Sequence, residues 1–282
     1  MEIYRIETGK VRIKKNQLIK SSSMAPKLAK ILLDKNWSEW LPIYAWVIDH
    51  PEGIIVVDTG ETAKTQNRGY FPNWHPYYAL AVEFKVEPED EIGPQLRKMG
   101  IDPNHDVSKV ILTHLHTDHA GGLHHFPNSE IIIDKNEYNA AQGFTGKLAG
   151  YLPHRWPTWL SPNLITLPAV LHEGFTHSQP VTQDRKIILV STPGHTANHL
   201  SVIAEKEDTH YFLAGDTSYT QDNMLRVLPD GVGTNENINT LQKIRSYSQL
   251  HPTIYLPSHD PDAPRRMANK EIAQGYFETQ KV

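Results

Sequence analysis

The chain has 282 residues, of which 39% are hydrophobic and 21% are charged, and its formal net charge at pH 7 is -4. This composition excludes an intrinsically disordered chain, and the net charge argues against a protein that binds nucleic acid through phosphate contacts. The sequence contains no cysteine, so any metal must be held by His, Asp or Glu.

The first five residues alternate like a strand and lead into a basic stretch, residues 10–15, that has no apolar core of a signal peptide. No window of the sequence approaches the roughly 18 consecutive apolar residues that a membrane-spanning helix needs. We therefore expect a cytoplasmic protein that does not bind a membrane.

Short runs rich in β-branched residues alternate with helical patterns along the chain, which predicts sheets covered by helices. No repeat, low-complexity tract or Gly/Ser linker marks a boundary, so residues 1–282 are expected to form a single domain. The strands are predicted at residues 43–48, 54–57, 110–113, 131–133, 187–190, 200–204, 211–213 and 253–256, and the helices at 88–99, 134–142, 235–249 and 264–277.

Three aromatic-rich segments, residues 21–42, 62–86 and 144–160, interrupt this pattern and are predicted to be long loops. Loops of this length in a compact domain are often functional lids. Their aromatic side chains would line an apolar pocket, or else complete the core or an oligomer interface. The candidate pocket residues are Met24, Trp46, Phe71, Trp74, Phe144, Tyr151 and Trp156.

The most informative motif places four potential metal ligands, His114, His116, Asp118 and His119, directly after a predicted strand. Imidazole and carboxylate are the usual ligands of zinc and its first-row neighbours. On an extended segment His114 and His116 lie on the same side and can share one metal. If a helix then begins, Asp118 and His119 are carried toward a second metal.

Three later residues, His195, Asp216 and His259, each come just after a predicted strand. Strand ends hold reactive groups with small positional error. A lone His after a strand is more often structural than a ligand, but the first motif leaves its metals short of ligands. These three residues are therefore candidate ligands.

The ordered set of ligands resembles the metallo-β-lactamase superfamily over about residues 58–259. The resemblance implies an α/β fold, a four-layer αβ/βα sandwich of two mixed β-sheets with helices on the outer faces. It also implies that Asp58, in the motif at residues 56–60, orients the metal-binding loop, although Asp and Gly also suit an ordinary turn.

The same resemblance implies two divalent metal ions, with zinc as the first choice and iron, cobalt or manganese as alternatives. Metal 1 would be bound by one group of histidines, metal 2 by a mixed group, and one carboxylate would bridge them. The implied ligands are His114, His116 and His195 for metal 1, Asp118, His119 and His259 for metal 2, and Asp216 as the bridge.

The same residues exclude some members of the superfamily, and one departure from its pattern concerns the subfamily. Oxygen reductases of the flavodiiron type would be expected to carry Glu where this chain has His116, and cysteine-ligated β-lactamases are excluded. After His195 the chain continues Thr-Ala-Asn-His where the family often has Thr-Pro-Gly-His, which alters a turn and keeps the ligand.

Tyr219, three residues after Asp216, resembles a Tyr of the N-acyl homoserine lactone lactonases that hydrogen-bonds the substrate carbonyl. Tyr219 would then donate to the developing oxyanion, unless it merely packs or caps the following segment. The resemblance further implies that a metal-bridging hydroxide attacks the lactone, and that Asp118 passes a proton to the ring oxygen.

The first hypothesis is therefore a quorum-quenching lactonase whose partner is a small lactone with an acyl chain. The alternatives are a phosphotriesterase, an arylesterase or a glyoxalase II-like thioesterase on the same scaffold, and a non-catalytic metal-binding protein. Aromatic loops suggest a homodimer without specifying one. His124 and His125 follow the metal motif, but a helix from Asp118 would point them elsewhere, so no third metal site is expected.

Overall fold

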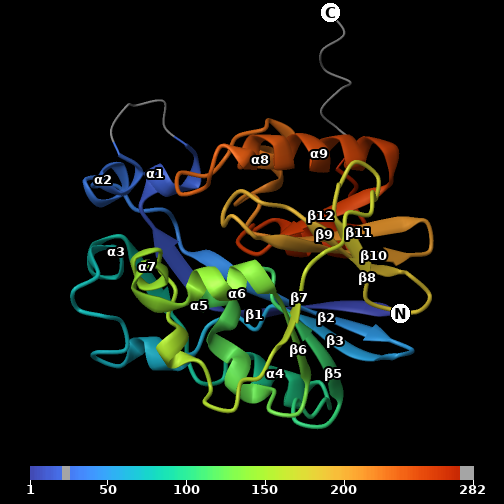
Figure 1. The fold of residues 1–282 in the computed structure, drawn as a ribbon, viewed down its shortest axis with the longest axis horizontal. Helices are drawn as coiled ribbons and strands as arrows, with labels where there is room; N and C mark the ends of the chain where they lie inside the picture. The colour runs from blue at the N-terminus through green and yellow to red at the C-terminus, as the bar shows by residue number, and fades with distance from the viewer. Residues whose placement is uncertain (21–25, 274–282) are drawn as a thin grey trace, which may run out of the picture. The chain divides into compact units, whose positions relative to one another are not determined.

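A computed structural model describes residues 1–20 and 26–273 of the chain. The chain divides into two compact units, Met1–Thr166 and Leu167–Val282, and each contains one β-sheet (Figure 1). The expectation of a single domain stays a prediction. Within the described residues, the helices lack the combination of length and apolar character needed to cross a membrane.

The first unit contains a seven-stranded mixed sheet with the order β4-β1-β2-β3-β5-β6-β7. Strands β4, β1, β2 and β3 pair in antiparallel fashion, and β3, β5, β6 and β7 pair in parallel. The strands are β1 (Glu2–Ile13), β2 (Leu41–His50), β3 (Gly53–Val57), β4 (Val82–Lys85), β5 (Val107–Ile111), β6 (Glu130–Asp134) and β7 (Asn163–Ile165).

The parallel register of β3 and β5 brings the segments that follow these two strands close together. Val57 lies opposite Ile111, so both strands end at the same edge of the sheet. The residues that follow them, Asp58 and the segment that begins at Leu112, therefore start side by side, and the backbone N–H of Asp58 donates to the carbonyl of Ile111 at 2.9 Å.

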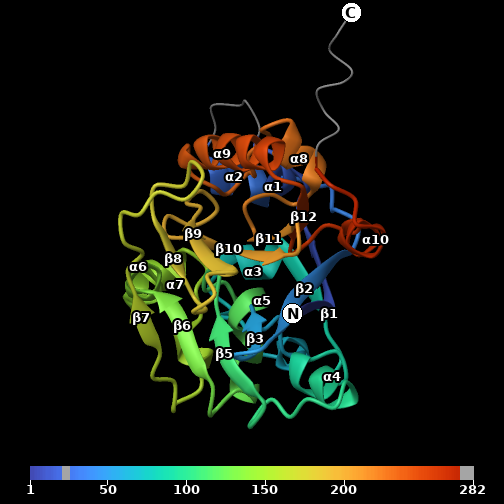
Figure 2. The same ribbon diagram turned by 90° about the vertical axis from the view of Figure 1, so that its right-hand side faces the viewer.

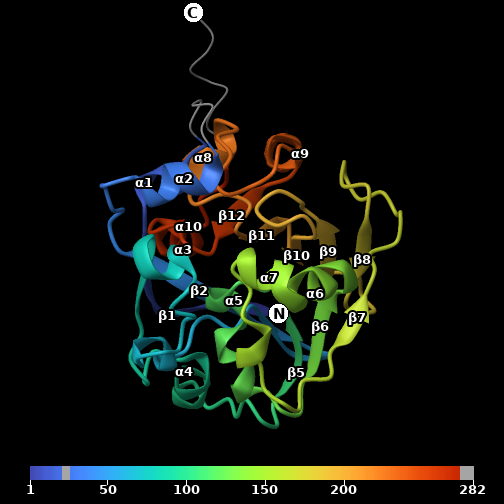
Figure 3. The same cartoon turned by 60° about the vertical axis from the view of Figure 1, so that its left-hand side comes forward.

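One face of this sheet packs against helices and forms the core of the unit. Val47, Val56 and Val110 from the strands are fully buried together with Leu96 and Leu123. Figure 3 shows α6 and α7 side by side next to β6. The helices are α1 (Lys15–Leu18), α2 (Lys27–Leu32), α3 (Pro76–Leu80), α4 (Ile92–Lys98), α5 (Thr117–Ala120), α6 (Lys135–Ala141) and α7 (Gly143–Leu148), with 3-10 turns η1 (Ala63–Gln66), η2 (Gly121–His125) and η3 (Pro153–Arg155).

The aromatic-rich segments contain short regular elements instead of continuous loops. The first includes α2 and the start of β2, the second includes η1, α3 and β4, and the third includes α7 and η3. Pro76 stands in the first turn of α3, where its missing N–H costs nothing. β4 pairs with β1, with Val82 opposite Ile13. Elements this short leave little periodicity in the sequence.

The second unit contains a five-stranded mixed sheet with the order β12-β11-β10-β9-β8, in which only β11 and β12 are parallel among the described strands. Helices α8 and α9 lie on one side of this sheet (Figure 1, Figure 2). The elements are β8 (Ser178–Pro180), β9 (Ile187–Ser191), β10 (Leu200–Lys206), β11 (Thr209–Gly215), β12 (Thr253–Pro257), α8 (Gln221–Leu225), α9 (Glu236–Leu250) and α10 (Ala263–Asn269).

The core of the second unit lies between α9 and the sheet. Leu241, Ile244 and Tyr247 of α9 are fully buried against Phe212 and Tyr255 of the strands. Burial of these large apolar and aromatic side chains supplies the main favourable term for the fold of this unit.

The predicted fold class is confirmed, because both sheets are mixed and both are accompanied by helices. The long helix predicted at 235–249 is α9, shifted by one residue. The helix predicted at 264–277 ends earlier, because Lys270 adopts a left-handed conformation with φ 53° that ends α10. Residues 274–277 of that prediction lie outside the described residues.

The α9 core yields a test of stability. Leu241→Ala should lower the free energy of unfolding by about 2–5 kcal/mol, because it leaves a cavity in a closely packed core. Leu250→Ala on the same helix, where Leu250 is 68% exposed, should change it by less than about 0.5 kcal/mol. Urea unfolding followed by circular dichroism measures both, and equal losses would contradict the assigned core.

Candidate metal-binding site

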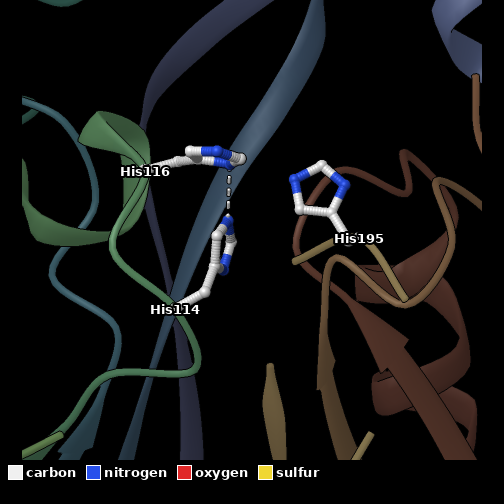
Figure 4. A group of neighbouring side chains, drawn as sticks. All are labelled: His114, His116 and His195. Atoms are coloured by element: carbon white, nitrogen blue, oxygen red, sulfur yellow. Dashed lines mark hydrogen bonds between the residues drawn. The ribbon is translucent and has the colours of Figure 1, made fainter. Parts of the chain in front are cut away.

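The first group of candidate ligands lies in the first unit, on the segment that follows β5. His116 keeps an extended backbone and precedes α5, which carries Asp118 and His119. His114 Nε2 and His116 Nδ1 lie 3.1 Å apart, as Figure 4 shows with a dashed line. The rings of His114 and His119 lie 4.0 Å apart. The segment thus carries three imidazoles and a carboxylate within one unit.

Asp58 holds this group from the neighbouring strand end. It is buried and has a φ of 59°, and its Oδ1 accepts the backbone N–H of Thr113 at 2.8 Å. Its Oδ2 accepts the Thr113 hydroxyl and His119 Nδ1, both at 2.8 Å. Since a carboxylate only accepts, His119 carries its proton on Nδ1 and presents the lone pair of Nε2 as a ligand.

The same reasoning fixes the tautomer of His114. The single hydroxyl proton of Thr113 goes to Asp58, so Thr113 Oγ1 accepts from His114 Nδ1 at 3.1 Å. His114 therefore also presents Nε2 as its ligand atom. Asp58 thus determines the tautomer of both imidazoles, that of His119 directly and that of His114 through Thr113.

A loop after Asp58 supports α5 from beneath. Thr59 N and Oγ1 both donate to the carbonyl of His119 at 2.8 Å. A Cβ on Gly122 would overlap the carbonyl of Thr59, so this close approach requires glycine. Glu61, fully buried, accepts from the Thr117 hydroxyl at 3.2 Å, and burial raises the pKa of its carboxyl to about 8.

Tyr151, a predicted pocket residue, lies beside this group. Its ring centroid is 5.1 Å from that of His116, and its hydroxyl donates to Glu137 at 2.8 Å. Glu137 also accepts the backbone N–H of Leu115 at 3.2 Å, between the first two histidines. Sequence analysis missed Glu137 because its position in the first turn of α6 looks like an ordinary helix start.

The other predicted pocket residues are placed differently. Trp74 and Phe144 are 52% and 68% exposed, and their rings stack with centroids 6.1 Å apart. Phe71 stacks on Tyr78 at 4.5 Å. These rings form an aromatic surface of the first unit.

Two predicted pocket residues are packing residues in the structure, and one is not described. Trp46 is fully buried in β2, with its ring 5.8 Å from that of Tyr44. Trp156 stacks on Tyr138 at 5.5 Å beside the core. Met24 lies outside the described residues.

The second group of candidate ligands lies in the second unit. His195 follows β9 and is also labelled in Figure 4, whereas Asp216 follows β11 and His259 follows β12. Asp216 Oδ2 lies 3.5 Å from His195 Nε2, and its Oδ1 lies 3.3 Å from His259 Nε2. Each carboxylate oxygen therefore faces one imidazole, which suits a carboxylate that bridges two cations.

Asp230 orients His195 as Asp58 orients His119. Its Oδ2 accepts His195 Nδ1 at 2.6 Å, which places the proton on Nδ1 and the lone pair on Nε2. Its Oδ1 accepts the backbone N–H groups of Val232, at 3.1 Å, and Gly233. Asp230 could not be recognised from the sequence, because an Asp between Pro and Gly has the pattern of a simple turn residue.

His199, which follows the altered turn after His195, is a supporting residue. Its Nε2 accepts the backbone N–H of Asp216 at 3.1 Å, so its proton is on Nδ1 and is donated to Thr192 Oγ1 at 2.9 Å. The residue is buried. His199 therefore fixes the backbone from which Asp216 projects.

Tyr219 lies beside the second group. It is 6% exposed, and its ring centroid is 5.8 Å from that of His259. The position of His259 is supported by the next residue, Asp260, which binds Arg266 at 2.6 Å and accepts the backbone N–H of Gln221 at 2.8 Å. Tyr219 therefore lies next to a candidate ligand of its own unit.

The donor chemistry of both groups fits divalent metal ions. Zinc–nitrogen bonds of about 2.0–2.1 Å in a tetrahedron place two nitrogens roughly 3.3 Å apart. The 3.1 Å between the nitrogens of His114 and His116 is close to that spacing. Three histidines present Nε2 because a carboxylate or hydroxyl takes the proton of Nδ1. Such fixed tautomers are typical of metal ligands.

Residues 38–259 match the family described as the Metallo-beta-lactamase superfamily. The chain is 28% identical over 256 residues to N-acyl homoserine lactonase AttM of Agrobacterium fabrum, a match that covers 87% of this chain and 93% of the relative. It is 31% identical over 228 residues to an N-acyl homoserine lactonase of a Bacillus species, with 80% and 84% covered.

Solved structures share the fold. An N-acyl homoserine lactone hydrolase with the product N-hexanoyl-L-homoserine at its catalytic metal centre has a TM-score of 0.72 and 23% sequence identity, and the match covers 93% of this chain and 94% of that one. The family implies divalent metal ions, which the two candidate ligand groups suit. The chain belongs to the metallo-β-lactamase superfamily.

Proposed function

We propose that this chain is a metal-dependent hydrolase that opens the lactone ring of N-acyl homoserine lactones and so quenches quorum sensing. The observation that carries the proposal is its similarity, over most of its length, to relatives named N-acyl homoserine lactonase. The tautomers of the histidines and the position of Tyr219 support the same activity. Cytoplasmic location and a homodimer stay predictions.

We propose that the two ligand groups together hold two divalent ions, with zinc as the first choice and iron, cobalt or manganese as alternatives. Two observations within the units support this assignment: the lone pairs fixed on Nε2 and the two-sided contact of Asp216 with its histidines. The proposed ligands are His114, His116 and His195 for one ion, Asp118, His119 and His259 for the other, and Asp216 between them.

When bound, the ions would supply the Lewis acidity that activates water and polarises the lactone carbonyl. The hydroxyl of Tyr219 would donate a hydrogen bond to the carbonyl oxygen as negative charge develops there. Asp118, partly exposed on α5, would pass a proton to the ring oxygen as the ring opens. Asp58 and Asp230 would act through the histidines that they orient.

The exposed aromatic rings Trp74 and Phe144 would receive the acyl chain of the substrate. Each methylene that leaves water contributes about 0.8 kcal/mol. The stacked pair lies in the unit that carries His114 to His119, on the segments that sequence analysis proposed as a pocket wall. Tyr151, next to His116, would border the same substrate.

The activity itself can be tested by measuring the metal content of the purified protein and following acid release from N-hexanoyl homoserine lactone. A phosphotriester, S-lactoylglutathione and a β-lactam serve as comparison substrates. We expect turnover of the lactone to exceed that of the others, because relatives that match most of the chain are named N-acyl homoserine lactonase. A protein with at least two bound metal ions that leaves the lactone intact would sink the proposal.

Tyr219→Phe should lower kcat for the lactone on the order of 10²-fold, because it removes one donor to the oxyanion. Bound metal should stay unchanged, since the phenyl ring keeps its place beside His259. Tyr211→Phe, at another buried Tyr of the same unit, is the matched control and should keep full activity. Equal kcat values for the two variants would show that Tyr219 only packs.

Asp230→Asn should weaken metal binding by roughly 10- to 100-fold, because the amide no longer fixes the proton of His195 on Nδ1. Competition with a zinc chelator measures the change. Asp222→Asn, at an exposed Asp paired with Arg226 on α8, is the control and should bind metal like the parent protein. Unchanged zinc affinity in Asp230→Asn would show that Asp230 does not support metal binding by His195.

A further inference from the structure

A second cluster of ligand-type side chains lies in the first unit, apart from the His114 to His119 segment. Glu91 precedes α4, and His124 and His125 end η2. Glu91 Oε2 lies 3.1 Å from His124 Nε2 and 2.6 Å from His125 Nε2. Both imidazoles therefore point at a single carboxylate oxygen, and their rings lie 4.0 Å apart.

This arrangement departs from the sequence-based expectation for His124 and His125. We expected a helix from Asp118 to point them away from any metal site. Instead, α5 ends at Ala120 and is followed by the 3-10 turn η2. The tighter winding of that turn brings consecutive histidines to the same partner.

The hydrogen bonds of His124 determine what its Nε2 can offer. His124 Nδ1 lies 3.2 Å from the carbonyl oxygen of Gly121, and a carbonyl only accepts, so Nδ1 carries the proton. In the neutral ring the lone pair of Nε2 then faces the carboxylate at 3.1 Å. Two lone pairs at this distance repel each other unless a proton or a cation lies between them.

A divalent cation would satisfy the carboxylate oxygen and both imidazole nitrogens at once, since all three donor atoms lie within 4.8 Å of one another. The cluster thus offers one carboxylate and two imidazole nitrogens.

The cluster is also held in place by its surroundings. Glu91 Oε1 accepts from the Thr62 hydroxyl at 3.0 Å and from the backbone N–H of Ala63 at 2.9 Å, which leaves Oε2 directed at the histidines. A Cβ on Gly93 would overlap the ring of His125, so glycine is required at that position of α4. Ligands oriented by outer partners in this way are typical of metal sites.

We propose that Glu91 Oε2, His124 Nε2 and His125 Nε2 bind a third divalent metal ion of the zinc class. The three donor atoms lie within 4.8 Å of one another, and a His₂-carboxylate set suits zinc and its first-row neighbours. Water fills the remaining position, because the side chain of His124 is 31% exposed.

Such an ion would connect three segments that support the first ligand group. Glu91 joins the start of α4 to the Thr62–Ala63 turn, and the histidines close η2, which directly follows α5 with Asp118 and His119. The role of the ion is structural, since it fixes the turn beneath those ligands. This inference does not depend on which substrate the enzyme hydrolyses.

The test is the number of zinc ions held per chain after removal of metal, addition of excess zinc and dialysis. We expect His124→Gln and His125→Gln each to hold one ion fewer than the parent protein, which should hold three. His105→Gln, at a largely exposed His bonded to Asp102, is the matched control and should hold as many as the parent. The test compares the zinc content of each variant with that of the parent protein. Its outcome therefore does not depend on how many ions the proposed catalytic ligands hold.

Equal zinc content in the parent and in the folded His124→Gln protein would overturn the proposal. So would a parent protein in which added zinc leaves the ring nitrogens of His124 and His125 unshifted by NMR. That second measurement needs no substitution and decides the matter if a variant fails to fold. Loss of an ion in His259→Gln with the His124 and His125 shifts retained separates this site from the proposed catalytic ions.

Discussion

The site depends first on the buried carboxylate of Asp58. It follows β3, and the parallel register of β3 with β5 places it against Thr113 and the histidine segment. Through its two oxygens it holds one backbone N–H, one hydroxyl and one imidazole. His119 donates directly to Asp58, so its proton is on Nδ1. The Thr113 hydroxyl also donates to Asp58 and therefore accepts from His114, whose proton is on Nδ1 as well. The pairing of β3 with β5 therefore determines that His114 and His119 both present Nε2 as the ligand atom.

In the second unit, other residues also hold an imidazole proton on Nδ1 and leave Nε2 as the ligand atom. Asp230, on a turn after α8, takes the proton of His195, and His199 holds the backbone of Asp216. Both units therefore prepare imidazole nitrogens in advance, and a metal need not select a tautomer when it binds. Such preorganisation is what a two-metal hydrolase requires of its scaffold. The Glu91 cluster follows the same rule, with the carbonyl of Gly121 taking the proton of His124.

The sequence predicted the parts of this protein that depend on local pattern. Three features are visible in a linear chain: the apolar run before His114, the strand-end positions of His195, Asp216 and His259, and the long helical pattern of α9. What it could not reveal are partners that meet through tertiary structure. Asp230 lies 35 positions from His195, and Glu91 lies 34 from His125. Short edge strands such as β7 and β8 were also missed, since three residues carry no period.

The proposed function requires two metal ions that both ligand groups bind, through imidazole nitrogens whose partner Nδ1 atoms carry the proton. An anomalous difference map from zinc-loaded crystals tests it most directly. At the proposed catalytic ligands we predict two peaks, one bound by His114 Nε2 and His195 Nε2 together with His116, the other by His119 Nε2 with Asp118 and His259, and both bound by Asp216. The ion proposed at Glu91, His124 and His125 would give a separate peak. A single peak at the catalytic ligands, or zinc on the Nδ1 atoms that face Asp58 and Asp230, would contradict it.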